Sequence, residues 1–407
     1  MPESKRLKTA LLLLLTPLLL VAQNTNSPYS RFGYGVLDQV SFGHTKGMGG
    51  VGIGIRENNM INAANPASYS AVDTMTMLFD FGLNVSNTLY KQGDASMNTP
   101  NGGLDYVAMK IPLKRWWGAA VGLYPLSNVG YSYSFDNKLS SGDAYTGTYT
   151  GSGGLNALFL GTSMAVGKHL ALGVNYKYIF GQITQSSIEN FVNTGIKDQT
   201  VSEYWYLNGS AFDIGLQYKN RINKRNEFVV GATFSEKAPL NNTVYKISIA
   251  TDTSYSNSSS SFDVPRTMGV GFSWIYDHRL TLAFDVNRQQ WSGAAFNGAV
   301  DSLSDMTRVS VGLEYLPSFM ANHYYKAIKY RLGFNYSNSY IKNDIGNLKN
   351  LGLTLGFGLP MNQTSALNVA FEMGKVIPPV STLVSETYFK VSLGMTFNEN
   401  WFFKRKL

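Results

Sequence analysis

The four histidines are the first side chains to examine for chemistry. His44, His169, His278 and His323 are separated from one another and lack spacings such as HxxxH or HExxH, which bind zinc. No Gly-x-Ser-x-Gly elbow offers a serine nucleophile. The chain has no cysteine, which excludes disulfides, thiolate metal sites and a cysteine nucleophile. We therefore expect no enzyme, no bound metal and no cofactor.

Charged side chains that alternate with apolar ones are a second possible source of function. Eight of them should face the inside of a β-structure: Lys177, Asp213, Asp285, Arg308, Glu314, Arg331, Glu372 and Lys390. Side chains that are opposite on neighbouring strands lie ~5 Å apart, so these charges can pair. The pairs would either stabilise a wall and anchor other residues such as Arg56 and Glu57, or steer a ligand or ion. We hypothesise that Arg331 contacts the segment that precedes the strands.

The elements that carry these charges have a period of two. Residues 351–359 place Leu351, Leu353, Leu355, Phe357 and Leu359 on one face and Gly352, Thr354, Gly356 and Gly358 on the other. In a soluble β-sandwich the face opposite the core would be charged and solvated. Here it is mostly small and polar, which favours a membrane barrel whose large apolar side chains face lipid.

Fourteen such segments can be counted, so the sequence predicts an all-β fold, a 14-stranded antiparallel transmembrane β-barrel over residues 75–397. An even number of strands lets the sheet close on itself, and lipid requires closure because it cannot satisfy an open sheet edge. The connections alternate between short turns and longer loops such as 91–102, 136–147, 188–200 and 237–262. Short turns are typical of the periplasmic side of an outer-membrane barrel.

The first 74 residues do not alternate. Residues 1–22 combine a basic start, a short apolar run and a small residue before Gln23, which is typical of a cleaved signal peptide. Residues 23–74 could form a small domain, a periplasmic tail or a plug. A fourteen-stranded barrel is wider than the ~8 strands whose own side chains fill the interior. We therefore expect residues 23–74 to be a plug inside the lumen.

The overall charge is positive, +8 for 407 residues, although only 15 % of the residues are charged. The basic residues are spread over separate short turns and do not form a stripe with stacking aromatics. We therefore expect no nucleic-acid partner and assign the chain to the bacterial outer membrane.

Several short motifs resemble FadL/TodX-type outer-membrane transporters of hydrophobic compounds. The run Gly47, Met48, Gly49, Gly50, Val51 and Gly52, followed by Asn65, Pro66 and Ala67, is similar to the family's N-terminal hatch. Leu280–Trp291, Val264–Gly271, Tyr330–Tyr336 and 351–360 resemble its barrel strands. The resemblance implies a barrel plugged by an N-terminal hatch that passes hydrophobic ligands, typically long-chain fatty acids.

The third predicted strand contains a proline, Pro125, followed by Ser127 and Asn128. Proline cannot donate to a β-ladder and is confined to edges and bulges. In the family that this chain resembles, the third strand is kinked inward and opens the wall toward the bilayer. Pro125, Ser127 and Asn128 are therefore candidates for such a lateral opening, although a proline at the extracellular rim would have no such role.

The C-terminal residues 398–407 form an aromatic and basic tail, which resembles the terminal segment that barrel-assembly machinery recognises. The expected partners are this machinery during insertion, outer-membrane lipid and a hydrophobic small molecule, and we expect a monomer. Two alternatives remain open. The first is a PorV-like barrel that binds secreted proteins, and the second is a general porin with an open lumen.

Overall fold

The computed structural model describes residues 25–192, 195–250, 253–258, 260–318, 322–342, 346–361 and 365–400. The predicted signal peptide and the last seven residues of the predicted tail lie outside this range. Five short helices are η2 (Pro28–Arg31), α2 (Gly43–Lys46), η3 (Pro66–Ser70), η4 (Trp291–Gly293) and α3 (Tyr324–Ala327). No helix within the described ranges is long and apolar enough to cross a membrane.

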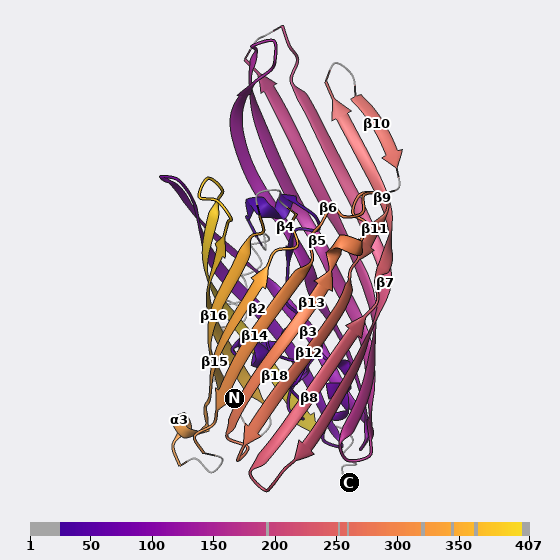
Figure 1. Ribbon diagram of the computed structural model, residues 1–407, viewed down its shortest axis with the longest axis vertical. Helices are drawn as coiled ribbons and strands as arrows, with labels where there is room; N and C mark the ends of the chain where they lie inside the picture. The colour runs from indigo at the N-terminus through magenta and orange to yellow at the C-terminus, as the bar shows by residue number, and fades with distance from the viewer. Residues whose placement is uncertain are drawn as a thin grey trace, which may run out of the picture.

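Strands make up most of the chain (Figure 1). Their bounds are β1 (Val36–Leu37), β2 (Thr76–Gln92), β3 (Ala95–Lys114), β4 (Trp117–Lys138), β5 (Ala144–Val166), β6 (Leu170–Phe191), β7 (Gln199–Arg221), β8 (Asn226–Ser235), β9 (Ala238–Ile249), β10 (Thr253–Ser258), β11 (Phe262–Val264), β12 (Arg266–Tyr276), β13 (Leu280–Gln290), β14 (Met306–Tyr315), β15 (Lys329–Asn338), β16 (Lys349–Pro360), β17 (Ala366–Ile377) and β18 (Ser385–Asn400).

These strands form a closed antiparallel barrel of fourteen strands, which confirms the predicted fold class. β18 pairs with β2 from Ser385 opposite Lys91 to Asn400 opposite Thr76, and this ladder closes the sheet. β8 and β9 together occupy one position in the barrel, because both pair with β7. β11 and β12 occupy the next position, on either side of Pro265.

The outer surface of the barrel is apolar. Leu353 and Leu355 on β16 are 55 % and 46 % exposed, whereas Thr354 between them is 2 % exposed and faces inward. Phe212 on β7 and Val270 on β12 are likewise exposed outward. This alternation suits a wall with lipid outside it and polar groups inside it. The chain is therefore built to span an outer membrane.

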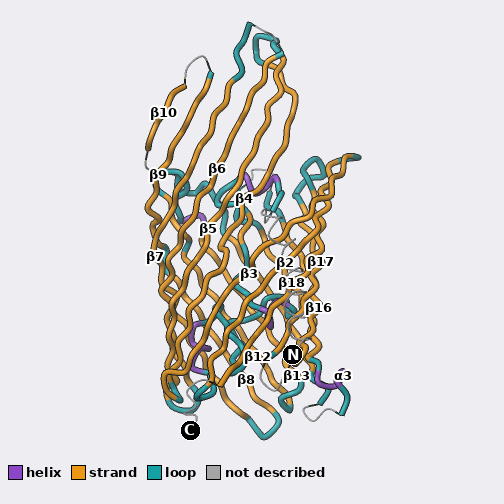
Figure 2. The backbone as a smooth tube through the Cα atoms, turned by 180° about the vertical axis from the view of Figure 1, so that it is seen from behind, coloured by secondary structure: helices purple, strands orange, loops and turns teal. Residues whose placement is uncertain are grey.

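The long connections differ from the sequence-based prediction. Residues 91–102 form a hairpin in which β2 and β3 meet at a two-residue turn, and most of 237–262 belongs to β9, β10 and β11. Within 136–147 and the described part of 188–200, β4 continues to Lys138 and β6 to Phe191, while β5 begins at Ala144 and β7 at Gln199. As a result β4–β7, β9 and β10 rise well beyond the rest of the barrel on one side (Figures 1 and 2). Their content of Ser, Thr, Asn and Gly predicts loops, but antiparallel ladders hold most of the described residues of these segments extended.

Residues 25–74, which we call the inner segment, lie within the barrel (Figure 2). Met48, Val51 and Tyr69 are completely buried. Asn65 caps η3 through a hydrogen bond that its side chain accepts from the Ala67 N–H, and Pro66 occupies the first helical position. The segment is mostly irregular, so side chains of the surrounding wall must satisfy many of its backbone groups.

Candidate functional site

Hydrogen bonds join the inner segment to strands all around the barrel. Gln217 on β7 donates to the carbonyls of Ile53 and Ile55, each at 3.0 Å. Thr354 on β16 accepts from the Gly49 N–H at 2.9 Å and donates to the Gly47 carbonyl at 3.1 Å. Because β7 and β16 are far apart in the order of strands, the segment bridges the lumen.

Glycines in the wall allow the backbone of the inner segment to approach closely. A Cβ atom at Gly231 on β8 would lie 2.0 Å from the Ile53 carbonyl oxygen, and one at Gly333 on β15 would lie 2.0 Å from the Gly49 nitrogen. Either contact is too short for any side chain. The small residues on the inward face of the strands therefore make room for the inner segment.

The residues of the predicted hatch motif all lie in this packed region. Gly47, Gly49, Gly50 and Gly52 follow α2, and Gly49 and Gly50 have φ angles of +68° and +78°, which favour glycine. Gly47 packs against Gly356, and Ala67 is completely buried. The Asn65 amide donates to the Ile53 carbonyl at 2.9 Å, while Pro66 contacts Gly173 and Gly215 of the wall.

Asp285 on β13 holds the glycine-rich turn. One of its oxygens, Oδ2, accepts from the backbone N–H groups of Gly52 at 2.6 Å and Ile53 at 2.8 Å. A carboxylate that receives two backbone N–H groups makes charge-assisted bonds, which are stronger than neutral ones. Asp285 therefore helps to fix the position of the inner segment, and it also lines the lumen.

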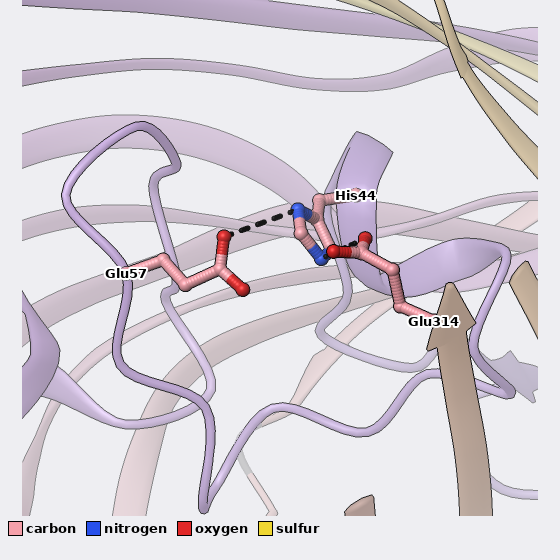
Figure 3. A group of neighbouring side chains, drawn as sticks. All are labelled: His44, Glu57 and Glu314. Atoms are coloured by element: carbon pink, nitrogen blue, oxygen red, sulfur yellow. Dashed lines mark ion pairs between the residues drawn. The ribbon is translucent and has the colours of Figure 1, made fainter. Parts of the chain in front are cut away.

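A buried charge cluster joins the same segment to the neighbouring strands β14 and β15. It comprises His44 and Glu57 of the inner segment with Glu314, Lys329 and Arg331 of β14 and β15. His44 Nε2 lies 2.9 Å from Glu314 Oε2, and its Nδ1 lies 4.0 Å from Glu57 (Figure 3). Lys329 lies 2.8 Å from Glu314 and 3.5 Å from Glu57. Burial disfavours ionisation of Glu57, but Lys329 and His44 outweigh it and lower the pKa of Glu57.

The same cluster could be considered as a metal site, because His44, Glu57 and Glu314 offer ligand atoms within 4.8 Å of one another. However, Arg331 Nε donates to Glu314 Oε2 at 2.7 Å, and Lys329 pairs with both carboxylates. A divalent cation would have to enter beside two buried cations that already balance the two carboxylates. The arrangement thus suits an ion-pair network that fixes the inner segment better than it suits a metal.

The other predicted lumen charges differ in their surroundings. Lys177 and Asp213 form an ion pair of 2.7 Å between β6 and β7. Glu372 and Lys390 are register partners, but no ion pair joins them within the described residues. Glu372 instead accepts from Tyr388 at 3.2 Å, and Lys390 lies 4.0 Å from Asp105. Arg331 donates to Asn368 on the wall, and its Cδ lies beside Gly47 of the inner segment. Its charge also acts on Glu57 of the inner segment.

β4 is distorted at the predicted kink. Leu126 is an extra residue in the ladder with β5, between Pro125 and Ser127. β3 and β4 are paired only from Lys114 opposite Trp117 to Val107 opposite Leu123, so the two strands part above that point. There β1 of the inner segment pairs with Ser127 and Asn128 of β4. A bulge therefore coincides with a break in the wall that the inner segment covers.

A chamber of about 180 Å³ lies beside this bulge, between the inner segment and the wall. We call it the apolar chamber, because most of its lining is apolar: Tyr34, Leu37, Val40, Ile53, Tyr124, Leu126, Leu155, Ile179, Val264, Trp291 and Met306. Its volume is comparable with the ~150 Å³ cavity that binds benzene in an engineered protein. The chamber can hold a molecule of about one aromatic ring.

A second chamber of about 210 Å³, the polar chamber, adjoins it on the side of β2 and β16–β18. Asp38 and Arg308 line both chambers. Burial raises the pKa of Asp38 above its ordinary value, although Lys390 and Lys46 oppose this shift. The lumen is thus divided into an apolar part and a polar part by residues of the inner segment.

Several of these residues were missed by sequence analysis. His44 is one of the four histidines whose spacing indicates no metal site, and no local pattern indicates its two glutamate neighbours. Lys110 on β3 is 1 % exposed and donates to the carbonyls of Met60 and Ala71. Its position could have been found, because the alternation of β3 points it inward.

Solved structures with the same fold are channels and transporters. One is the CymD monoaromatic hydrocarbon channel, with 14 % identity and a TM-score of 0.60, in a match that covers 90 % of this chain and 99 % of that one. Another is the Pseudomonas putida toluene transporter TodX, with 16 % identity and a TM-score of 0.58, in a match that covers 89 % of this chain and 99 % of that one. A Pseudomonas aeruginosa FadL homologue has a TM-score of 0.63 at 10 % identity and covers 91 % of this chain and 100 % of its own. The predicted resemblance to FadL/TodX-type proteins is therefore confirmed for the fold.

No curated protein sequence matches the chain significantly. A family match, in contrast, extends over residues 4–407 and so includes both the inner segment and the barrel. The chain belongs to the BamG family.

Proposed function

We propose that the protein is a passive outer-membrane transporter of small hydrophobic molecules, and that the inner segment is a hatch that gates it. The observation that carries this proposal is the apolar chamber, which lies between the inner segment and the bulged part of β4. Structures of the same fold include a toluene transporter and a monoaromatic hydrocarbon channel, which supports a ligand of this kind.

The route that we propose leaves through the wall. β3 and β4 are unpaired above Leu123, so displacement of β1 from β4 would open the chamber sideways toward the bilayer. A hydrophobic molecule that leaves in this direction avoids the polar chamber. Longer ligands, including fatty-acid-like molecules, exceed the chamber as it stands and would require a larger displacement of the hatch. A general porin is disfavoured, because the inner segment fills much of the lumen.

A disulfide between β1 and β4 tests this route. Leu37 and Ser127 are antiparallel register partners, and such partners lie within disulfide range. The chain has no cysteine, so the variant Leu37→Cys/Ser127→Cys can form only this bridge. We expect uptake of radiolabelled toluene by intact cells to fall when the bridge forms and to recover on reduction.

The matched control is Met164→Cys/Leu172→Cys, a register pair on the lipid-facing side of β5 and β6. Its oxidation should leave uptake unchanged. Equal uptake by the oxidised and reduced forms of the first variant would contradict the gate, and steady ion conductance in a planar bilayer would favour an open porin.

A second candidate function is protein binding, as in the PorV-like alternative. The observation that favours it is a groove on the extension above the barrel, lined by Tyr204, Tyr206, Tyr245 and Tyr255. In the described residues β10 pairs only with β9, so its other edge can accept a further strand. If this function is correct, Tyr206→Ser/Tyr255→Ser should abolish co-purification of a protein partner and leave toluene uptake intact.

A further inference from the structure

The inward face of β13 and β14 carries four polar side chains that form a two-by-two arrangement, which we call the polar tile. Asp285 is directly opposite Ser310, and Asn287 is directly opposite Arg308. Opposite residues in an antiparallel ladder lie ~5 Å apart and diagonal ones within ~8 Å. All four residues line the apolar chamber.

The polar tile is poorly satisfied by the protein itself. Asp285 is 6 % exposed, and its Oδ2 accepts from the inner segment. Its Oδ1 is buried and has no hydrogen bond of good geometry, although the Gly54 N–H lies close to the carboxylate. Ser310 is 2 % exposed, and its hydroxyl is also buried without a partner. Within the described ranges, neither Arg308 nor Asn287 makes a side-chain hydrogen bond or an ion pair, although the charges of Glu372 and Asp38 act on Arg308. Buried polar groups are normally paired, so a concentration of unpaired ones calls for a ligand group or water.

Inward polar side chains on the strands beside the polar tile do have hydrogen-bond partners, so the lack of partners is particular to the polar tile. Ser273 on β12 donates to the Gly54 carbonyl at 2.8 Å, and Arg331 on β15 pairs with Glu314. The inner segment therefore engages the polar groups on either side of the polar tile and one oxygen of Asp285, and it leaves Asn287, Arg308 and Ser310 facing the chamber.

The mixture of donors and acceptors limits which ligand group would fit. An anionic group would approach Arg308 but would meet the carboxylates of Asp285 and Asp38, which line the same chamber. A cationic group would pair with Asp285 but would meet the Arg308 guanidinium. A neutral hydroxyl can donate to Asp285 Oδ1 and accept from Arg308 or Ser310, so it satisfies both sides without adding charge.

We propose that the polar tile is a hydroxyl-recognition subsite, and that the preferred ligands are neutral, ring-sized apolar molecules that carry one hydroxyl group, such as phenols. The ring would lie against Trp291, Tyr34 and Leu37 in the apolar chamber, with the hydroxyl on Asp285 and Arg308. This inference rests on the proposed transport function, because it assumes that the chamber takes ligands.

The test compares p-cresol with toluene, which differ by one hydroxyl group. Binding to the full-length protein in nanodiscs is measured by calorimetry, with empty nanodiscs to correct for partition into lipid. A hydrogen bond to a charged group should favour p-cresol by about 10-fold in Kd. Arg308→Met/Ser310→Ala should remove this preference and leave the Kd for toluene within about twofold, since the apolar lining is unchanged. Ser310→Ala alone, a smaller change, should reduce the preference partially.

The control variant is Lys390→Met, which changes a cation of the polar chamber and should keep the preference for p-cresol. Equal binding of p-cresol and toluene by the unmodified protein, or an unchanged preference in Arg308→Met/Ser310→Ala, would overturn the subsite but not the transport function. Tighter binding of benzoate than of p-cresol would identify an anion site and overturn the hydroxyl assignment. If none of the three probes binds beyond empty nanodiscs, the proposed function itself fails.

Discussion

Arg331 donates from Nε to Glu314 at 2.7 Å across the ladder of β14 and β15, and the same carboxylate lies 2.9 Å from His44 of the inner segment. The side chains of Arg331 and Glu314 are only 2 % and 6 % exposed, so their ion pair is buried. It links the wall of the barrel electrostatically to the segment inside it.

Neutralising the shared carboxylate should loosen the inner segment. Glu314→Gln leaves Lys329 and Arg331 buried without an adequate counter-charge, and breaking a buried ion pair in this way costs about 3–5 kcal/mol. We expect faster tryptic cleavage at Arg56 and a lower unfolding temperature, measured by the change in gel migration of the heated barrel. Arg331→Ala should also accelerate the cleavage.

Glu203→Gln is the matched control, because Glu203 pairs with Lys246 on the exposed extension. An exposed pair contributes about 0–1 kcal/mol, so cleavage and unfolding should be nearly unchanged. If Arg331→Ala left both quantities unchanged, the hypothesis that Arg331 contributes to anchoring the inner segment would have to be given up.

A methyl group on a wall glycine should displace the inner segment. Gly231→Ala places a Cβ 2.0 Å from the Ile53 carbonyl oxygen, and overpacking of this kind costs about 1–3 kcal/mol. We expect increased ion conductance in a planar bilayer, because the segment can no longer fill the lumen. Gly293→Ala is the control, since no heavy atom lies within 4 Å of its Cβ position. Identical conductance of the two variants would show that close packing at Gly231 is not needed.

Lys110 on β3 should stabilise the C-terminal part of the inner segment, residues 56–74. Its ammonium group donates to the carbonyls of Asn58, Met60 and Ala71. Lys110→Met leaves these acceptors unpaired, with a cost of about 3 kcal/mol. We expect faster hydrogen–deuterium exchange over residues 56–74, while Lys114→Met, at an exposed turn, should leave exchange as it is. Unaltered exchange in Lys110→Met would refute this role.

Acidification should weaken the anchoring through Glu57. The pKa of Glu57 is lowered in the folded protein from its ordinary value of 4.5, because Lys329 and His44 outweigh the effect of burial. A lowered carboxyl pKa stabilises the fold at pH values above the unfolded pKa, and this contribution is lost as the pH falls through the folded pKa. The anisotropy of a fluorophore at Asn59→Cys should therefore decrease below about pH 4.5.

Glu57→Gln in the same labelled protein provides the comparison. It should have lower anisotropy at neutral pH and a smaller decrease on acidification, because the titrating group has been removed. A decrease of the same size in both proteins would assign the effect to other carboxyl groups.

The order of residue types is enough to specify the barrel, because outward apolar residues and inward small residues alternate with a period that only strands have. The alternation of Leu353, Thr354 and Leu355 suffices to place two side chains in lipid and one in the lumen. The same alternation predicts that the charges of β6, β7, β14 and β15 point inward. In the structure Lys177 pairs with Asp213, and Glu314 pairs with Arg331.

The partners of those inward groups, in contrast, depend on how the whole chain packs. The inner segment has no periodic pattern, so nothing local in the sequence predicts that His44 reaches Glu314 or that Gly52 reaches Asp285. Likewise, Glu372 and Lys390 are register partners, yet Glu372 accepts from Tyr388 and Lys390 lies near Asp105. A strand's period specifies the face on which a side chain lies, whereas its partners in a lumen come from distant parts of the chain, and their packing is set by the closed barrel as a whole.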